Sequence, residues 1–545
     1  MSSHDISLPM HANKASIQDK EEHYTPESRS PIVPPTSNIK GTTRFSPFWR
    51  DRLCEAGLVL SMLLYYIIAN PNIRIGPLAS LNPLLSLPFL LVFVALCWYR
   101  LPFAIALLPL TLPFYMFQKV VVTHYEFSLA ELTLYVCTAV ALLRLLILRG
   151  DRQARVAWPQ LLNRLGPFAM PALIFLVTAA LSIFVAYERW FAVRDFRKEI
   201  FDPLLYLVLA LLYLRSRQDM LRLLAALLGT GALIALLGLV QYFLLKNTLV
   251  LEPDGVRRVH TVYGSANSIG LLFDYILPIA LAWMLARVSW RNRFMAVVLC
   301  VSMAVVLYLT HSLGALIGIA VAAVFVLAFS LRSRRLLLIG ALLAIIVGAA
   351  VLAVYHVQIT HLLFEHHVSQ QGVSTTTKRL YLWQTALAMI HDSPWLGYGL
   401  DNWLCHYSIN NVCPTNLHHY WILRDPLTGM STGLAEEPTL SHPHNTFLHI
   451  WVSMGFFALL AFVSVLVLFY WLFTRILLRL HSMLSANSEQ LRWITVGIGA
   501  ALLAVLVQGQ VDSAFLEQDL SYCFWILIVL HLLQRVHAGT SWRKE

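Results

Sequence analysis

The chain has 545 residues, of which 58% are hydrophobic and only 13% are charged, and its mean hydropathy is +0.66. A soluble protein carries about 25% charged residues, so this composition excludes an ordinary water-soluble globular protein. The formal net charge is +11. The basic residues lie mostly between apolar runs, where membrane proteins concentrate them in cytoplasmic loops, and we therefore predict no nucleic-acid partner.

Residues 1–45 are polar and rich in Pro, Ser and Thr, and they lack an apolar stripe that could bury a core. We predict a disordered cytoplasmic tail, with no secretory signal peptide before the first apolar run. The remaining chain is predicted to divide into three parts: transmembrane helices 1–11 over 46–355, a large periplasmic loop over 356–444, and transmembrane helices 12–14 with a short cytoplasmic C-terminus over 445–545.

A series of apolar runs follows the tail, each near the roughly 20 residues that a helix needs to cross a bilayer. The sequence therefore predicts an all-α, polytopic integral membrane protein with about 12–14 transmembrane helices and short helices in its large loop. The predicted spans are 54–70, 84–99, 101–121, 127–148, 167–187, 201–214, 221–245, 268–286, 294–309, 313–331, 336–355, 445–473, 493–511 and 520–533.

The connections between spans alternate in charge, and every even-numbered connection is basic. Positive charge marks the cytoplasmic side, so both chain ends of this multi-pass protein are predicted to be cytoplasmic. The arginines of these connections are Arg149, Arg152, Arg155, Arg164, Arg215, Arg217, Arg222, Arg287, Arg291, Arg293, Arg332, Arg334, Arg335, Arg475, Arg479 and Arg492.

Two predicted outer connections depart from this pattern because they also carry positive charge. Such residues either anchor lipid headgroups or bind an anionic substrate, and arginine suits phosphate because its planar fork pairs with two oxygens at once. The first connection, 187–200, carries Arg189, Arg194, Arg197 and Lys198, and the other carries Lys246, Arg257 and Arg258. Our substrate-binding candidates among them are Arg194, Arg197, Lys198, Arg257 and Arg258.

The outer connection between residues 355 and 445 is about 90 residues long, far beyond an ordinary loop, which indicates a functional segment. Apolar residues at helical spacing predict a helix over 377–391, and a turn follows at Asp392-Ser393-Pro394. Cys405 and Cys413 lie together in this polar stretch. An outer location permits a disulfide between them, whereas the other five cysteines lie in apolar runs and fit a core.

The large loop and its flanks are rich in histidine, which raises the question of a metal site. No HExxH or CxxC accompanies these histidines, and the chain has no DxD and no GxxxxGK phosphate loop. We predict no metal centre and no cofactor, and we disfavour ATP-driven transport and nucleotide-sugar chemistry. The histidines are His356, His361, His366, His367, His406, His418, His419, His442 and His444.

The end of the loop carries the most specific pattern. His444-Asn445 is followed by nine residues, then Gly455, with Ala458 three positions further. This resembles the signature of the bacterial O-antigen ligase family, in which a His and a small polar residue precede Gly-x-x-Gly by nine residues; Ala458 replaces the second Gly.

Three further blocks are similar to the same family. Residues 379–399, RLYLWQTALAMIHDSPWLGYG, resemble its loop motif of an Arg, a Trp-containing helix and Pro-x-x-Gly-x-Gly. Residues 264–267, GSAN, and 310–312, THS, resemble two others, although Leu313 stands where the family usually has Arg. The resemblance covers roughly residues 167–533.

This resemblance implies a metal-independent glycosyltransferase of the bacterial inner membrane. It would move a glycan from undecaprenyl pyrophosphate to an acceptor hydroxyl, on lipid A-core or another glycan, at the periplasmic face. The acceptor needs a proton acceptor that works near neutral pH, for which histidine is the usual choice. We predict His444 as this base, with His442 as the fallback. Arg379 is predicted to assist at the pyrophosphate, and Asn445 to contact substrate.

Four alternatives remain open at this stage. An O-antigen or exopolysaccharide polymerase of the same superfamily is the nearest, followed by a protein O-oligosaccharyltransferase. A polysaccharide flippase or other transporter would instead use intramembrane carboxylates such as Glu131, Asp202 and Asp274. Acceptor choice, glycan identity and oligomeric state have no readable sequence code.

Overall fold

The computed structural model describes residues 47–73, 76–122, 125–147, 160–251, 257–330, 375–407, 413, 417–420, 441–483 and 486–539. The chain divides into two compact units, residues 1–49 and 50–545, and the first is described only over residues 47–49. The predicted tail, the predicted span 336–355 and the histidines His356, His361, His366 and His367 lie outside the described residues.

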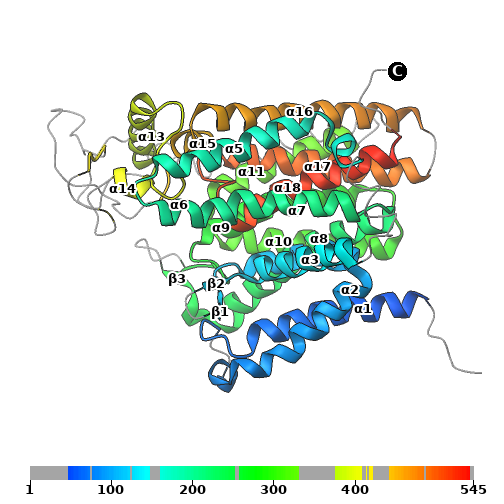
Figure 1. Cartoon of the computed structure of the whole chain (residues 1–545). Helices are drawn as coiled ribbons and strands as arrows, with labels where there is room; N and C mark the ends of the chain where they lie inside the picture. Colours follow the sequence, from blue (N-terminus) through cyan, green and yellow to red (C-terminus); the bar gives the residue numbers. More distant parts are fainter. Residues whose placement is uncertain are drawn as a thin grey trace, which may run out of the picture. The chain divides into compact units, whose positions relative to one another are not determined.

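Most described residues lie in helices (Figure 1), and ten of these helices are long and apolar enough to cross a membrane. The predicted all-α, polytopic membrane fold is therefore confirmed. The ten spans are Pro83–Phe114, Leu129–Ile147, Gln160–Val185, Arg217–Leu244, Ala266–Leu285, Trp290–Leu309, Leu313–Ser330, Phe456–Ser482, Ser488–Gln508 and Gln518–His537.

The labels used below follow chain order. The α-helices are α1 Pro47–Ile67, α2 Leu87–Leu107, α3 Leu129–Ile147, α5 Ala169–Val185, α6 Arg189–Asp195, α7 Asp202–Tyr213, α8 Arg217–Leu244, α9 Ala266–Leu285, α10 Trp290–Leu309, α11 Leu313–Ser330, α13 Thr375–Asp392, α14 Trp403–Tyr407, α15 Thr446–Met454, α16 Phe456–Ser482, α17 Ala486–Gln508 and α18 Gln518–His537. The short helical turns are η1 Gly76–Ser80, η2 Pro83–Ser86, η3 Leu108–Phe114, η4 Gly166–Phe168, η5 Phe196–Phe201 and η6 Lys246–Thr248, and the strands are β1 Lys119–Val122, β2 Tyr125–Phe127, β3 Val250–Leu251 and β4 Arg257–Arg258.

Helix α18 lies at the centre of the packing, since every residue from Gln518 to Arg535 is buried. It contacts α7, α16, α17 and α9. Its polar first turn is buried as well and therefore needs partners. Gln518 donates to the Ser128 hydroxyl (2.9 Å), and Asp519 accepts from the Tyr263 hydroxyl (2.9 Å). These bonds fix the start of α18 against the segments before α3 and α9.

Two predicted spans, 84–99 and 101–121, meet at a break in α2. Arg100 has non-helical angles (φ −139°, ψ 60°), and Pro102 follows it inside the helix, where the missing N–H and the ring interrupt the hydrogen-bond ladder. The Arg100 guanidinium pairs with Asp51 at 3.1 Å. Arg222 also pairs with Glu55 at 2.8 Å. Charges at the predicted cytoplasmic ends of α1, α2 and α8 therefore neutralise one another.

The last part of the predicted span 101–121 is not helical. The helical turn η3 ends at Phe114, and β1 pairs antiparallel with β2 in a hairpin. The Lys119 ammonium donates to the Tyr65 carbonyl (2.5 Å) and the Ile68 carbonyl (2.6 Å) at the end of α1. A cation there satisfies carbonyls that a helix end leaves open, which explains why this lysine is buried.

Most of the predicted connection 187–200 is helical. Helix α6 continues through η5, a single π-helical turn, directly into α7. A π-turn adds one residue to the helical repeat and changes the direction in which the following side chains point, and such turns are frequent at functional sites. The cationic residues of this connection therefore stand on a helical scaffold.

The predicted span 445–473 consists of two helices, α15 and α16, separated at Gly455. The backbone of Gly455 has φ +82°, and a Cβ at this position would lie 1.9 Å from the Trp395 carbonyl oxygen. Only glycine fits such a close approach. The Phe456 amide donates to the Pro394 carbonyl at 2.9 Å, and the Tyr398 amide donates to the Val452 carbonyl at 2.8 Å. The segment with the Pro-x-x-Gly-x-Gly motif and the segment around Gly455 are therefore packed together and hydrogen-bonded.

Candidate active site

His444 lies immediately before α15 and faces a carboxylate from a different part of the chain. Its Nδ1 atom is 2.8 Å from Oδ1 of Asp512, in the connection between α17 and α18. The imidazole is 19% exposed, whereas the carboxylate is 7% exposed. Burial alone would raise the pKa of Asp512, but the hydrogen bond and positive charge of His444 lower it to about 2. Asp512 is therefore ionised at any physiological pH.

The two residues after His444 join this segment to the α17–α18 connection. Asn445 caps α15, because its Oδ1 accepts from the Phe447 and Leu448 amides (both 3.0 Å). Its Nδ2 donates to the Gln510 carbonyl at 3.0 Å. Thr446 donates its amide to the Gly509 carbonyl at 2.8 Å. These bonds hold His444 at a fixed distance from Asp512, and they engage both polar groups of the Asn445 amide.

Two other histidines pack around this pair. The ring of His442 lies 4.4 Å from that of His444 and stacks at 5.4 Å on that of His449. The Nδ1 atom of His442 accepts from the His444 amide at 3.3 Å. Burial, together with the nearby His444, lowers the pKa of His442 to about 3. His442 is therefore neutral near pH 7 and supports the position of His444.

The donor atoms of His442, His444 and Asp512 all lie within 4.8 Å of one another. Two imidazoles and one carboxylate form a set that a divalent transition metal accepts. Of the histidines that suggested a metal site and that the structure describes, only His442 and His444 meet in this way. Farther along the loop, the ring of His406 packs on Tyr398, and that of His418 packs on Tyr420.

The helix predicted over 377–391 is α13, and it contacts the segment that carries His444. The Trp383 indole donates to the His444 carbonyl at 3.4 Å. Burial lowers the pKa of the half-buried Arg379, whereas the charge of Asp512 opposes that shift. This mutual influence places the Arg379 guanidinium within electrostatic reach of Asp512. Arg379 and His444, predicted from separate motifs, therefore lie at one site.

The cations of α6 and η5 stand among carboxylates. Arg194 donates from Nε to Asp195 (2.7 Å) and also pairs with Asp401 from the large loop. Arg197 pairs with the fully buried Glu131 at 2.9 Å. Burial lowers the pKa of Lys198. The guanidinium-bearing side chains remain 39% and 30% exposed, so each is oriented by a carboxylate and still accessible to a ligand.

Comparison with known proteins assigns part of this chain to a family. Residues 298–463 match the family described as O-antigen ligase. We refer to these matched residues below as the O-antigen ligase domain. It contains Arg379, His444 and Gly455, and the match confirms the predicted place in the O-antigen ligase and polymerase superfamily. The family supports a glycosyltransferase-type activity, as ligase or polymerase. No curated protein matches the chain.

The basic pair on β4 lies elsewhere in the fold. Arg258 donates to the Thr310 carbonyl (2.6 Å) and to the Asn267 side-chain oxygen (2.7 Å). These partners belong to the GSAN and THS blocks, on either side of the start of the O-antigen ligase domain, and the bonds tie the start of α9 to the end of α10. Arg257 is exposed on the same strand. Arg258 therefore links the start of α9 to the end of α10. The structure gives no contact between His444 and either Arg257 or Arg258 among the described residues.

Cys405, in α14, and Cys413 form a disulfide within the O-antigen ligase domain. The other five cysteines are free and buried. The three carboxylates considered for transport also have defined surroundings. Glu131 pairs with Arg197, Asp202 accepts from the Tyr135 hydroxyl at 2.8 Å, and Asp274 is buried in α9 without a hydrogen-bond partner among the described residues.

Sequence reasoning missed several carboxylates that surround the O-antigen ligase domain. Burial and the nearby Asp519 and Asp512 raise the pKa of Glu517 to about 8. Burial, followed by Asp195, Asp401 and Glu517, raises the pKa of Glu199 well above its usual value. Glu517 therefore interacts electrostatically with Asp512, the partner of His444, and with Glu199 in η5. The detectable signal was the short polar connection 509–519, which is acidic and has the same predicted outer location as His444.

Proposed function

We propose that the chain transfers a glycan from undecaprenyl pyrophosphate to an acceptor hydroxyl, on lipid A-core or another glycan, at the periplasmic face of the bacterial inner membrane. The observation that carries this proposal is the hydrogen bond between His444, which lies in the segment that matches the O-antigen ligase family, and Asp512, with Arg379 nearby. The ionised Asp512 orients the proposed base, and the cationic side chains of α6 and η5 are suited to bind the leaving pyrophosphate.

His444 acts in this proposal as the general base. The ionised Asp512 accepts the Nδ1–H of His444, which selects the tautomer with its lone pair on Nε2. That lone pair takes the proton from the acceptor hydroxyl as the hydroxyl oxygen attacks the anomeric carbon of the donor. Asp512 then stabilises the imidazolium that forms, and Asn445 holds His444 in place rather than contacting substrate.

The leaving pyrophosphate gains negative charge as its bond to the sugar breaks, and preset cations lower the energy of that state without a metal. Arg194, Arg197 and Lys198 are assigned this role, with Arg379 near the base. Their carboxylate partners Asp401 and Glu131 fix the direction of each guanidinium before substrate arrives. Arg257 and Arg258 are assigned to a more distant contact with membrane lipid or donor.

The periplasmic location follows from the arginine-rich connections, which the positive-inside rule assigns to the cytoplasm. His444, Asp512 and α6 are all on the opposite side of this predicted topology. A lipid-linked glycan assembled and delivered to that side is a suitable donor, and cleavage of its bond between the sugar and the pyrophosphate drives transfer without ATP.

The proposal is tested with purified chain in lipid nanodiscs, supplied with undecaprenyl-pyrophosphate-linked glycan and lipid A-core. We expect glycan on lipid A-core and free undecaprenyl pyrophosphate. A product lengthened on the lipid-linked glycan instead would assign the polymerase reaction of the same superfamily. In a deletion strain, ligase loss removes all long-chain lipopolysaccharide bands, whereas polymerase loss leaves a single-repeat band. No transfer to either acceptor would refute the proposal.

A further inference from the structure

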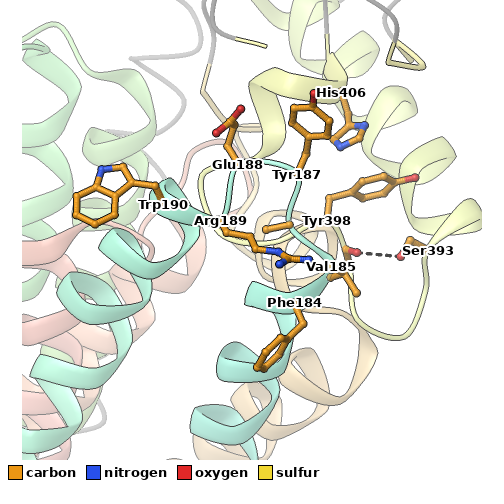
Figure 2. Close-up of a pocket in the computed structure, with 11 residues that line it drawn as sticks. Phe184, Val185, Tyr187, Glu188, Arg189, Trp190, Ser393, Tyr398 and His406 are labelled. Carbon is orange, nitrogen blue, oxygen red and sulfur yellow. Dashed lines mark hydrogen bonds between the residues drawn. The ribbon is translucent and has the colours of Figure 1, made fainter. Parts of the chain in front are cut away.

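A surface cavity of about 800 Å³ lies between the end of α5 and the segment that follows α13 (Figure 2). One wall is formed by residues 184–190 and the other by residues around Tyr398. The volume is within the range of about 300–1,000 Å³ for sites that bind small molecules. The roles assigned above to His444 and Arg194 do not use this cavity.

The cavity combines aromatic rings with a cation. Figure 2 shows Tyr187 beside His406, while Arg189 reaches between Phe184 and Tyr398. Arg189 has no ion-pair partner within the part of the chain that the structure describes, unlike Arg194 and Arg197 on the same helical stretch. The Arg189 guanidinium is therefore available to a ligand.

Tyr398 and His406 are held in place from behind the cavity. The Tyr398 hydroxyl lies 2.6 Å from the Tyr420 hydroxyl, which donates to Asp392 at 2.7 Å. The ring of His406 packs at 4.6 Å on that of Tyr398. Burial lowers the pKa of His406 to about 4, so this histidine is neutral near pH 7. A neutral imidazole can donate one hydrogen bond and accept another, as sugar hydroxyls require.

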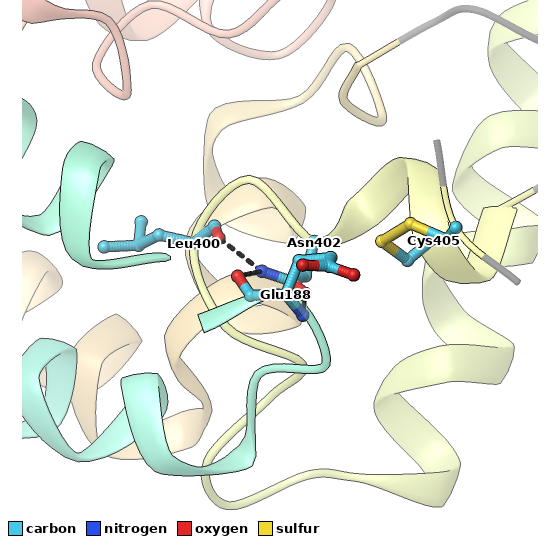
Figure 3. The surroundings of a disulfide bond; sticks show 5 residues. Glu188, Leu400, Asn402 and Cys405 are labelled. Atoms are coloured by element: carbon cyan, nitrogen blue, oxygen red, sulfur yellow. Dashed lines mark hydrogen bonds between the residues drawn. A yellow bond between two sulfur atoms is a disulfide. The ribbon is translucent and has the colours of Figure 1, made fainter. Parts of the chain in front are cut away.

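The two walls are joined by several contacts, which Figure 3 shows around Asn402. The Asn402 side chain accepts from the Glu188 amide (2.7 Å) and donates to the Glu188 carbonyl (3.2 Å) and the Leu400 carbonyl (2.8 Å). A Cβ on Gly399 would lie 2.4 Å from that of Ala186, so only glycine permits this approach. The Cys405–Cys413 disulfide ties down the residue beside His406. The cavity is therefore preformed.

We propose that this cavity binds sugar rings of a glycan substrate, an inference that rests on the proposed function. The C–H faces of a sugar pack against the rings of Tyr187 and Tyr398, while its hydroxyls bond to His406 and Arg189. The unpaired Arg189 favours a glycan that carries a carboxylate or phosphate substituent.

The position of the cavity supports this assignment. The Tyr398 amide bonds to Val452 in α15, the helix that begins just after His444. Arg189 is the first residue of α6, which also carries Arg194. A glycan in the cavity therefore contacts α6 directly and also contacts a wall that is hydrogen-bonded to α15.

Binding is measured on purified His444→Ala protein in nanodiscs, which cannot turn over. The probes are delipidated core oligosaccharide, lipid-linked glycan, and undecaprenyl pyrophosphate without glycan. Tyr187→Ala, Tyr398→Ala and Arg189→Gln, each combined with His444→Ala, are expected to weaken glycan binding about tenfold, as the loss of one good contact does. Tyr398→Phe keeps the ring and should stay within about threefold. Phe243→Ala removes an aromatic ring that is 62% exposed at the end of α8 and serves as the matched control.

The two probes that carry glycan separate the possible sources. Weaker binding of the core oligosaccharide alone assigns the cavity to the acceptor, and weaker binding of the lipid-linked glycan alone assigns it to the donor. Unchanged glycan binding in all three variants overturns the inference, and so does equal weakening of glycan binding by Phe243→Ala. If the variants weaken only the binding of bare undecaprenyl pyrophosphate, the cavity residues anchor lipid and the inference is also overturned. Turnover by the His444-containing protein is measured in parallel, so the proposed function fails separately if that protein transfers nothing.

Discussion

The imidazole of His444 and the carboxylate of Asp512 are hydrogen-bonded at 2.8 Å, although 68 positions separate them in the sequence. One lies at the end of the large loop and the other in the short connection between α17 and α18. The bonds of Asn445 and Thr446 to Gln510 and Gly509 bring these two segments together. The hydrogen bond to Asp512 fixes the orientation of His444, the proposed base, for which the sequence motif alone indicates no partner.

Asp512→Asn should lower kcat by about 10²- to 10⁴-fold with little change in donor KM, because the amide no longer fixes the tautomer or stabilises the imidazolium. Asp512 itself, with a pKa of about 2, does not titrate between pH 5 and 9. Asp512→Glu should recover part of the rate. An unchanged kcat in Asp512→Asn, or an effect on donor KM alone, would contradict this role.

Arg194→Ala and Arg197→Ala should each lower the rate of transfer by at least about tenfold, since each loses charge-assisted hydrogen bonds to the pyrophosphate that are individually worth ~1.5–3 kcal/mol. The lysine variants should recover only part of the rate, because the two-oxygen geometry is lost. Arg293→Ala, at the predicted cytoplasmic end of α10, is the matched control and should transfer normally.

Arg197→Ala also leaves the buried Glu131 without its ion-pair partner, which could impair folding rather than chemistry. The double variant Arg197→Ala/Glu131→Gln removes that unpaired charge. It should express normally and show the same reduced rate of transfer. If Ala variants at both arginines transfer glycan at wild-type rates, the pyrophosphate assignment is wrong and these residues anchor lipid headgroups.

Glu517 makes the stability of the folded chain depend on pH. Its pKa is raised to about 8 by burial and by Asp519 and Asp512, so the folded state holds a proton that the unfolded state releases near pH 4. The contribution of Glu517 to the free energy of unfolding is therefore fully present below about pH 4 and is lost as pH rises toward 8. Glu517→Gln cannot ionise, and its Tm in nanodiscs should exceed that of wild type by a growing margin from pH 5 to pH 9. A constant margin would contradict the raised pKa.

The predicted topology and the Cys405–Cys413 disulfide test each other. A disulfide persists in the periplasm and not in the cytosol, so both cysteines should resist alkylation in intact cells until a reductant is added. A reporter that is active only in the periplasm should be silent when fused after Glu545. An active reporter there would invert the topology.

Composition and apolar periodicity were sufficient to predict the membrane class and most helices, because each span must satisfy its own backbone in lipid. Boundaries were wrong where a local interaction interrupts an apolar run. Lys119 binds the end of α1 and ends one predicted span early. Gly455 divides another because the Trp395 backbone passes too close for any side chain.

The family resemblance predicts that His444 and Arg379 act at one site, since both lie in segments that carry its motifs. The partner of His444 was not predicted, because Asp512 stands in an ordinary-looking connection and only the three-dimensional fold brings it near. The same reason explains the missed Glu517 and Glu199. Arg189 was counted among topology exceptions, and its cavity depends on contacts between Glu188 and Asn402 that no spacing reveals.

The central claim is that His444 accepts the proton in a transfer that needs no metal. The direct test compares purified wild type with His444→Ala in EDTA, with lipid-linked donor and acceptor both supplied. We predict full wild-type turnover in EDTA, a loss of about 10²- to 10⁴-fold in the variant with donor binding retained, and a much smaller loss in His442→Ala. Normal turnover by His444→Ala would contradict the base assignment. Loss of wild-type turnover on chelation would instead assign His442, His444 and Asp512 to a metal centre.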